Sequence, residues 1–346
     1  MDLNLKMSSL SYKWSLKDYP EKENFNVFTT FACGGGSTMG YKLVGLNVIG
    51  ANDIDKQMAE VYKLNHNPKY YYLCDIRDMQ KQELPEEFFN LDILDGSPPC
   101  SSFSMVGNRE KDWGKEKVFT EGQSKQVLDD LFFYFLDLAN KLQPKVIIAE
   151  NVKGILMGNA QGYVKQIIKR FDEIGYNLQL FQLNGASMGL PQTRERVFFI
   201  GARKDLNLPK LKLDFNEKCI SFFEATKDLV INSYKPLTPL VQHYWKNAKQ
   251  GESVGKFKAI RKIYKNKPCP TLTTSLLFHY NEPRLLSKNE IIRCGSFPSD
   301  YNFNNLKPQY LIGMSVPPLM MAKIASEIKK QWLSIAKSNE IQQNVV

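Results

Sequence analysis

One cysteine of this chain stands where a nucleophile would be expected. Cys100 follows the segment Leu91–Ser97, which predicts a buried strand, and the proline pair Pro98-Pro99. Consecutive prolines fix φ and remove backbone donors, so they hold the following residue in one pose. Ligands of open α/β sheets bind outside the carboxyl ends of the strands, so a thiolate placed there could attack a substrate. For an isolated cysteine, packing beneath a loop is the alternative.

Acidic and basic side chains occur near the ends of two further predicted strands. The strand Val146–Val152 closes on Glu150-Asn151-Val152, and the segment Gln192–Arg196 leads into the apolar run Val197–Ile200. A carboxyl group at a strand end can donate or accept a proton in catalysis. The two arginines of the second segment, Arg194 and Arg196, could hold an oxygen or a phosphate of the substrate.

Together these segments resemble the DNA cytosine-5 methyltransferase family, of the bacterial or phage modification type. Pro99-Cys100, Glu150-Asn151-Val152 and Gln192-x-Arg194-x-Arg196 follow one another in the family's usual order, and the resemblance extends from Val27 to about Ile328. It implies that Cys100 adds to carbon 6 of cytosine while Glu150 donates a proton to ring N3. It also implies that Arg196 contacts the cytosine oxygen and that Arg194 supports the site. The target base would have to be flipped out of the duplex.

The first part of the chain predicts a unit that binds a nucleotide-like cofactor. A strand at Asn26–Phe31 is followed by the glycine-rich turn Ala32–Gly40 and then by an apolar helical pattern. Glycines let the backbone approach a ligand, and the helix N-terminus offers N–H groups to a carboxylate or phosphate. The next two predicted strands end at Asp53 and Asp75, and an acid after the second strand suits a ribose diol. By itself this pattern leaves nucleotides, flavins and S-adenosyl-L-methionine open.

The family resemblance, together with the absence of a GxGxxG motif, favours S-adenosyl-L-methionine as the cofactor. It implies that Asp53 binds the ribose, that Phe31 and Ile54 pack against adenine, and that Asp75 binds the adenine amino group. For the neighbouring Asp55, a helix N-cap is the alternative role. The predicted cofactor-binding residues are Phe31, Gly34, Gly35, Gly36, Asp53, Ile54, Asp75, Ile76, Pro99, Ser315 and Val316.

Two residues depart from the family pattern. Cys33 stands where the family usually has glycine, and Met314 stands where it usually has asparagine. Both lie in segments assigned to the cofactor, so we expect them to alter cofactor affinity. The predicted catalytic residues are unaffected by either change.

The order of strands and helical patterns predicts an α/β fold. We expect a doubly wound, mostly parallel seven-stranded sheet with helices on both faces, as in Rossmann-like S-adenosyl-L-methionine methyltransferases. A helical pattern from about Ser124 to Leu142 supplies one crossover. A smaller, basic target-recognition domain follows the sheet. The expected ranges are 1–24 for an N-terminal extension, 25–202 with 303–346 for the catalytic and cofactor-binding domain, and 203–302 for target recognition.

The positive charge of the chain is concentrated in one segment. The whole chain has 46 Lys/Arg and 36 Asp/Glu, a net charge of +10, and residues 203–268 contain 15 Lys/Arg and 6 Asp/Glu, a net of +9. Such a patch predicts a polyanionic partner, and the resemblance makes that partner double-stranded DNA. A solvated lysine-rich surface is the alternative. The resemblance implies that a polar loop at 105–119 closes over the DNA, and a disordered surface excursion is the alternative. The predicted DNA-binding residues are Ser104, Gln192, Arg261, Thr271 and Leu272.

Several classes of protein are disfavoured by composition. The six cysteines form no CxxC pair and there are only three histidines, so we expect no metal. The sequence contains no apolar run long enough to predict a membrane span or a signal peptide, so we expect a cytoplasmic protein. Two alternatives remain open, a tRNA cytosine-5 methyltransferase and a non-catalytic nucleic-acid binding protein with the same fold. We expect a monomer and allow for a cognate restriction endonuclease.

Overall fold

The computed structural model describes residues 10–99, 130–157, 160–231, 234, 236–254, 257–273 and 276–343. Several predictions fall elsewhere in the chain. Cys100, Ser104, the loop 105–119 and the first part of the predicted helix 124–142 lie outside the described residues.

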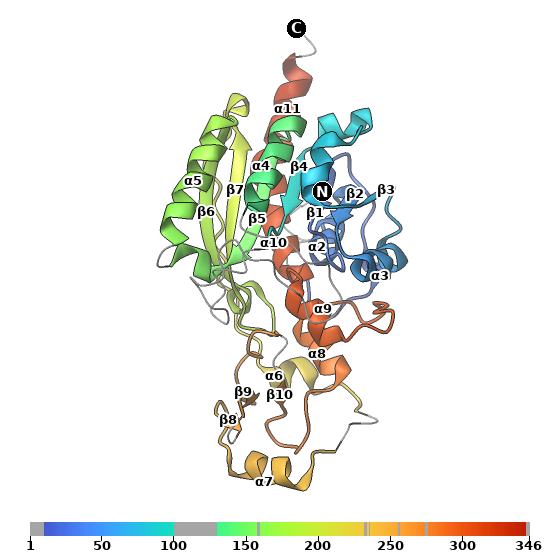
Figure 1. Cartoon of the computed structure of the whole chain (residues 1–346), viewed down its shortest axis with the longest axis vertical. Coiled ribbons are helices and arrows are strands. Elements are labelled where there is room, and N and C mark those ends of the chain that lie inside the picture. Colours follow the sequence, from blue (N-terminus) through green and yellow to red (C-terminus); the bar gives the residue numbers. More distant parts are fainter. Residues whose placement is uncertain are drawn as a thin grey trace. The chain divides into compact units, whose positions relative to one another are not determined.

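Seven strands form one sheet in the order β3-β2-β1-β4-β5-β7-β6 (Figure 1). Neighbouring strands from β3 to β5 are parallel, and β7 is antiparallel to β5. The predicted α/β class and mostly parallel seven-stranded sheet are therefore confirmed. The strands are β1 (Asn26–Thr30), β2 (Asn47–Asp53), β3 (Tyr70–Leu73), β4 (Ile93–Gly96), β5 (Val146–Val152), β6 (Tyr176–Asn184) and β7 (Glu195–Arg203).

Helices connect these strands and build the rest of the chain. Helix α3 begins where the Asp55 side chain accepts hydrogen bonds from the N–H groups of Gln57 and Met58, which satisfies donors that have no partner within the helix. Asp55 is thus an N-cap. The helices are α2 (Gly36–Leu43), α3 (Lys56–His66), α4 (Leu131–Leu142), α5 (Ala160–Glu173), α6 (Phe222–Thr226), α7 (Pro239–Asn247), α8 (Lys288–Cys294), α9 (Pro308–Met314), α10 (Pro318–Ile328) and α11 (Ser334–Gln343), with a π-helical turn at Lys329–Leu333.

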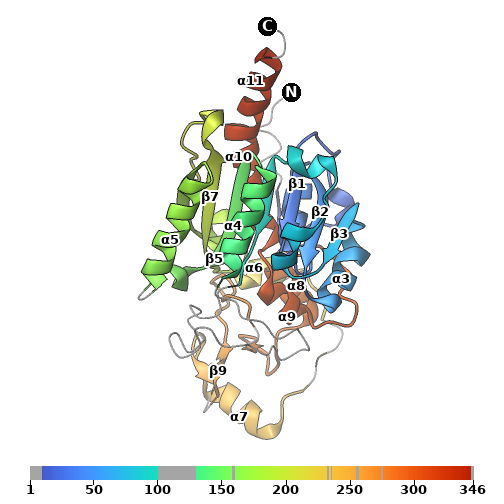
Figure 2. The same ribbon diagram turned by 45° about the horizontal axis from the view of Figure 1, so that its top comes forward.

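Side chains of the sheet alternate between its two faces. Leu94, Ile147 and Phe199 belong to a buried apolar cluster that also contains residues of α4 and α5. The two helices lie along one face of the sheet (Figures 1 and 2). Adjacent residues point to the opposite face, where Tyr41 of α2 donates a hydrogen bond to Asp95 of β4. Helices therefore cover both faces.

Contacts divide the chain into two compact units. The second unit holds the large sheet, and the first holds α6 to α9 and a small sheet of β8 (Ser253–Val254), β9 (Phe257–Lys262) and β10 (Leu277–Phe278). The main segment of the first unit begins at Phe215, and two segments distant in sequence belong to the same unit. The expected domain ranges stay predictions. The first unit is Met1–Asp18, Asn184–Arg194 and Phe215–Lys323; the second is Tyr19–Leu183, Glu195–Asp214 and Ile324–Val346.

One helical stretch, Pro308–Glu340, is long and apolar enough to cross a membrane by length and composition alone. In this structure 78% of its apolar window is buried. Such burial is typical of a core helix, so the apolar composition is accounted for by packing.

Gly96, the last residue of β4, allows a test of how closely β4 packs against β1 and α4. A Cβ atom at Gly96 would lie 2.6 Å from Thr30 Oγ1 and 2.7 Å from Phe135 Cε2. Gly96→Ala should therefore lower the free energy of unfolding by about 1–3 kcal/mol, the usual cost of overpacking. Urea unfolding of the purified variants measures this change.

Gly162 of α5 supplies the matched control. A Cβ atom there would meet nothing within 4 Å, and alanine is the better helix former, so Gly162→Ala should raise the free energy of unfolding by about 0.5–1 kcal/mol. A Gly96→Ala protein as stable as the wild type would contradict the close approach of β4 to β1 and α4.

Candidate functional site

The carboxyl ends of β1 and β4 lie side by side. β1 pairs with β2 on one edge and with β4 on the other, so the chain order of the strands reverses at this point. Ligands of α/β proteins bind outside the strand ends at such a switch point. The glycine-rich turn follows β1, and Ser97-Pro98-Pro99 follows β4. The predicted cofactor turn and the segment before Cys100 therefore leave the sheet from neighbouring strands.

An ion pair joins the end of β5 to the start of β7. Arg196 Nε lies 2.8 Å from Glu150 Oε1, with 13% and 10% of the two side chains exposed. The antiparallel register places Glu150 opposite Phe198 and Val152 opposite Arg196. Glu150 and Arg196 are therefore diagonal neighbours on one face of the sheet. The guanidinium group orients the carboxyl group that is predicted to donate the proton.

Asn151 ties β5 to the turn that precedes Cys100. Its Nδ2 donates to the Pro98 carbonyl oxygen over 3.1 Å, and Asn151 is 4% exposed. A buried amide that is satisfied by a backbone carbonyl fixes the position of that backbone. No sequence pattern assigned a role to Asn151, and its place beside Glu150 was the only signal.

The glycine-rich turn is left-handed at three positions. The φ angle is 50° at Phe31, 49° at Cys33 and 85° at Gly35. For residues other than glycine this region costs roughly 1–2 kcal/mol. The usual glycine of the family at the position of Cys33 is explained by this backbone conformation. Here the Cys33 N–H group donates to Asp53 Oδ2 over 2.7 Å, which helps to hold the turn.

Asp53 lies at the end of β2, half-buried beside this turn. Its Oδ1 accepts a hydrogen bond from the Asp55 N–H group over 2.9 Å, and its Oδ2 accepts from Cys33. Burial raises the pKa of Asp53 to about 6, while these backbone donors lower it. A carboxylate offers about four lone-pair sites, so Asp53 can still accept from a ribose diol.

A small cavity next to the turn gathers the residues that were predicted to bind adenine. Phe31, Ile54, Asp75 and Ile76 all line it. Its volume is about 20 Å³, which is room for about one water molecule. An adenine ring would therefore have to lie across the mouth or displace side chains. The complete lining is Phe31, Asn52, Ile54, Cys74, Asp75, Ile76 and Leu131.

Two polar side chains hold the rim of this cavity. Asp75 accepts from the Arg77 N–H group and forms a 2.9 Å ion pair with the Arg77 guanidinium. Asn52 is 1% exposed and donates from Nδ2 to the carbonyl oxygens of Tyr72 and Cys74, each over 2.9 Å. Asn52 thereby fixes the chain at the end of β3, a role that the sequence analysis missed.

Asp95 is a buried acid near the same end of the sheet. It is 2% exposed, and its Oδ1 accepts from the Tyr41 hydroxyl over 3.0 Å. Asp95 pairs with Ile148 in the register of β4 and β5, so its side chain points to the same face as Glu150. Burial raises the pKa of Asp95 to about 7; hydrogen bonds from Tyr41 and Ser37 lower it, and the charge of Glu150 raises it.

Arg194 lies in the first unit and is 2% exposed. Its guanidinium group donates to the carbonyl oxygens of Leu272, Gly313 and Ser315 over 3.2, 3.0 and 2.8 Å. Arg194 therefore joins two segments of this unit, and its predicted support of catalysis stays a prediction. Ser315 and Val316, the predicted cofactor residues of this unit, are 3% and 5% exposed.

The residues predicted to bind DNA divide into buried and accessible ones. Gln192 and Leu272 are fully buried, and Gln192 donates to the Cys294 carbonyl while accepting from the Leu272 N–H group. A direct contact of these two residues with DNA would require the segment to open. Arg261 is exposed and Thr271 is half-exposed, so both are accessible in this conformation.

The cations of the basic segment are not all available to a ligand. Lys246, Lys249 and Lys267 are exposed. Lys262 is 8% exposed, lies 3.9 Å from the Trp245 ring centroid and donates to the Trp245 carbonyl. It is part of the core of the first unit, so the charge of the segment overstates the number of cations at its surface.

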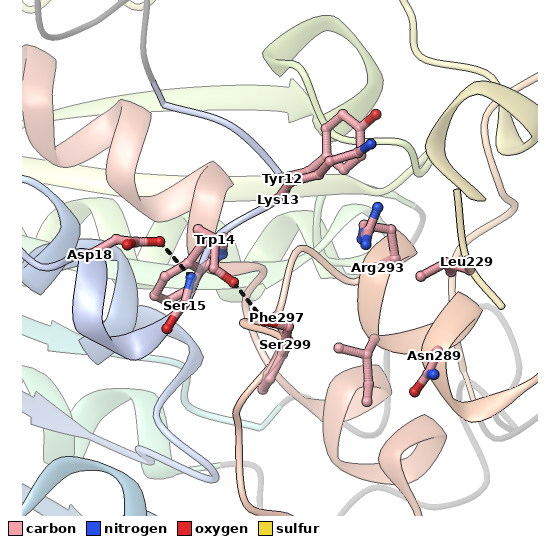
Figure 3. A pocket seen from close by; sticks show the side chains of 11 residues that line it. Tyr12, Lys13, Trp14, Ser15, Asp18, Leu229, Asn289, Arg293, Phe297 and Ser299 are labelled. Carbon is pink, nitrogen blue, oxygen red and sulfur yellow. Dashed lines mark hydrogen bonds between the residues drawn. The ribbon is translucent and has the colours of Figure 1, made fainter. Parts of the chain in front are cut away.

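A larger cavity, of about 360 Å³, lies in the first unit and is lined by none of the predicted site residues (Figure 3). The N-terminal segment forms one wall, since Trp14 Nε1 donates to the Ser296 carbonyl over 2.8 Å. Lys13 and Arg293 both pair with Asp228, at 3.0 and 3.2 Å. These contacts make residues 10–18 part of this unit's packing.

Within the described ranges, no group of three His, Cys, Asp or Glu side chains is arranged to hold a metal ion. The polar groups gathered at the strand ends are carboxyl, guanidinium and amide groups. This set suits proton transfer and the binding of an anion or a polar ring.

The sheet is of the doubly wound, Rossmann-like type, with an acid and an arginine at its strand ends. The model of the C-5 cytosine-specific DNA methylase family matches residues 25–266 and 210–330. These matches cover most of the chain, and the protein belongs to this family. The predicted family is therefore confirmed.

Individual relatives agree with this assignment. The chain is 35% identical to the type II methyltransferase M.FnuDI of Fusobacterium nucleatum over 189 residues, which is 55% of this chain and 50% of the relative. The chain thus spans about half the length of that relative. It is 28% identical to the type II methyltransferase M.DdeI of Desulfomicrobium norvegicum, over 91% of each protein.

A solved structure shows the same fold. The crystal structure of a protein assigned as a DNA modification methyltransferase, encoded within an E. coli prophage, superimposes with a TM-score of 0.71. The match covers 89% of this chain and 99% of that one, at 20% sequence identity.

The buried carboxyl group of Asp95 predicts a pH dependence of stability. Because the pKa of Asp95 is raised to about 7 in the folded protein, against about 3.9 unfolded, the folded state holds the proton more tightly. This tighter proton binding by Asp95 stabilises the folded state fully below about pH 4, and the stabilisation is lost as the pH rises through about 7. The free energy of unfolding should fall by on the order of 2–4 kcal/mol across this range.

Asp95→Asn removes this titration and keeps an oxygen that can accept from Tyr41. The free energy of unfolding of the variant should therefore fall less between pH 5 and pH 8 than that of the wild type, as measured by urea unfolding at both pH values, taken as about the useful range. Equal falls in the two proteins would show that Asp95 is not titrating in this range.

Proposed function

We propose that the protein transfers a methyl group from S-adenosyl-L-methionine to carbon 5 of cytosine in a specific double-stranded DNA sequence. The observation that carries the proposal is the Glu150–Arg196 ion pair at the end of β5. Asn151, the residue after Glu150, holds the Pro98 carbonyl two residues before Cys100. A nucleophile, a proton donor and a cation for the ring oxygen are the groups that activation of cytosine requires.

The residues around the glycine-rich turn fit S-adenosyl-L-methionine. Asp53 would bind the ribose, Phe31 and Ile54 would pack against adenine, and Asp75 would bind the amino group. Phe31, Ile54 and Asp75 support this fit because they line one cavity beside the turn. When bound, the cofactor supplies an electrophilic methyl group. Gly34, Gly36, Ile76, Pro99, Ser315 and Val316 are assigned to the same ligand by family resemblance.

In this proposal Cys100 starts the reaction. Its thiolate forms a bond to carbon 6 of cytosine, and the electrons of the ring double bond move to make carbon 5 nucleophilic. Glu150 donates a proton to ring N3, which offsets the negative charge that develops on the base. Arg196 orients Glu150 and contacts the cytosine oxygen. After carbon 5 is methylated, a base removes its proton, the bond to Cys100 breaks as the thiolate leaves, and the N3 proton returns to Glu150.

The target cytosine must leave the duplex to reach these groups, at a cost of a few kcal/mol. We assign the loop 105–119, Ser104 and the basic segment to this step. Arg261 and Thr271 would be the accessible contacts, whereas Gln192 and Leu272 are buried. Arg194 would act by holding the backbone at Leu272 and Ser315. The enzyme would act as a cytoplasmic monomer, and a restriction endonuclease of the same specificity would be its functional partner.

Covalent trapping tests the role of Cys100. DNA that contains 5-fluorocytosine cannot lose a proton from carbon 5, so elimination is blocked and the wild-type protein should remain bonded to it. A pool of random-sequence duplexes avoids the need to know the recognition sequence. We expect a complex that resists denaturing electrophoresis with the fluorinated pool and none with ordinary cytosine.

Two variants separate the steps of this reaction. Cys100→Ser should form no adduct. Glu150→Gln should fold and bind S-adenosyl-L-methionine but react about 10²-fold more slowly or worse, because the proton donor is lost. A wild-type protein that methylates DNA without forming an adduct would contradict the mechanism, and a Glu150→Gln protein with wild-type turnover would remove Glu150 from it.

The basic segment predicts a salt-dependent affinity for DNA. If about six of its cations contact phosphates, log affinity should fall against log salt with a slope of about −5, as counterion release requires. Arg261→Gln should reduce the magnitude of this slope by about one. Fluorescence anisotropy with a fixed duplex at about 50–300 mM salt measures it.

Lys169→Gln supplies a matched control for Arg261→Gln. Lys169 is also exposed, with 78% of its side chain accessible, but lies on α5 in the second unit and pairs with Glu173. It should leave the slope unchanged. A flat salt dependence in the wild type would mean that the segment is only a solvated surface.

A further inference from the structure

We propose that His66 is a positioning residue for the cofactor, which acts by fixing the peptide between Gly34 and Gly35. This inference rests on the proposed function, because it assumes that the glycine-rich turn binds S-adenosyl-L-methionine. His66 is the last residue of α3, and neither its sequence neighbours nor the chemistry of methyl transfer assigns it a role.

A hydrogen bond joins His66 to the turn. His66 Nε2 lies 3.1 Å from the Gly34 carbonyl oxygen, and His66 is 6% exposed. A carbonyl oxygen can only accept, so the proton of this bond must be on Nε2. The imidazole is thereby a buried donor aimed at the backbone of the turn.

The same peptide is held from its other side. The Gly35 N–H group donates to the Ala32 carbonyl oxygen over 2.8 Å. Because the peptide unit is planar and trans, its carbonyl and N–H groups point in opposite directions. A bond at each end therefore fixes the plane of the Gly34–Gly35 peptide. The first residues of α2, which follow at Gly36, take their direction from that plane.

The ring of His66 is itself held in place. It packs edge-on against Tyr62, with ring centroids 4.6 Å apart. A Cβ atom at Gly35 would lie 2.1 Å from His66 Nε2, so the turn approaches the ring as closely as a glycine allows. Lys42 Nζ donates to the His66 carbonyl over 3.0 Å, which secures the end of α3 against α2.

His66 keeps its single donor at every pH at which the protein would work. Burial lowers the pKa of His66 to about 3, and the charge of Lys42 lowers it further, while the bond to Gly34 raises it. A neutral imidazole carries one N–H group. Its bond to Gly34 is therefore constant, and His66 acts through geometry alone.

Loss of the His66 hydrogen bond should affect cofactor binding more than the chemical step. A loop whose peptide planes are already fixed loses less freedom when it binds a ligand. Removal of the His66 donor should weaken cofactor binding and raise the KM for S-adenosyl-L-methionine. It should leave kcat close to that of the wild type, because His66 touches no reacting atom.

The test compares three variants of the full chain by calorimetry with S-adenosyl-L-homocysteine. His66→Phe keeps a ring and loses the donor, and we expect its Kd to rise about three- to tenfold, the range set by one lost hydrogen bond. His66→Gln can place an amide N–H group near the position of Nε2, so it should restore a Kd close to that of the wild type.

Val61→Ala is the matched control for general loosening of α3. Val61 is fully buried on the same helix, so truncation of its side chain should cost stability. The variant should lose stability as His66→Phe does but keep the wild-type Kd. If His66→Phe fails to fold, His66→Asn provides the same test, because its shorter amide does not reach Gly34.

Each result has a distinct meaning. A wild-type Kd for His66→Phe would overturn the positioning role. A Kd for Val61→Ala raised as much as that for His66→Phe, or no recovery by His66→Gln, would also overturn it. A wild-type protein that binds neither S-adenosyl-L-methionine nor S-adenosyl-L-homocysteine would instead contradict the proposed function.

Discussion

The ion pair between Glu150 and Arg196 depends on the register of β5 against β7. Side chains of a strand alternate between faces, so a slip of one residue would turn one partner away from the other. The register is stabilised on the opposite face, where Ile147, Ala149 and Phe199 are buried with α4 and α5. Apolar packing on one side of the sheet thus determines which polar groups meet on the other.

The cofactor turn depends on a second constraint, because its left-handed residues are costly by themselves. Contacts from outside the turn offset that cost. Asp53 accepts from the Cys33 N–H group, and His66 donates to the Gly34 carbonyl. Asp53 is thereby both the proposed ribose ligand and a support of the turn, so its substitution should affect more than one contact. Support by distant side chains is typical of precise binding loops.

The sequence predicted features that depend on neighbouring residues, but it did not predict those that depend on contacts between distant residues. The strand that ends at Asp53 and the strand that ends two residues after Glu150 were predicted because apolar runs stop at charged residues. Asn52 and His66 were missed, because their partners lie 20 to 32 residues away and ordinary core packing would explain the same residue types. For the same reason, no pattern indicated that residues 10–18 and 184–194 belong to the unit that contains 215–323.

The central claim is that Cys100 directs methyl transfer to carbon 5 of cytosine in DNA. Methylation-sensitive sequencing of DNA and RNA from cells that express the wild-type protein or Cys100→Ala tests it most directly. We expect 5-methylcytosine at one recurring DNA sequence with the wild type and none at that sequence with the variant. Methylation confined to tRNA, or DNA methylation that survives Cys100→Ala, would contradict it.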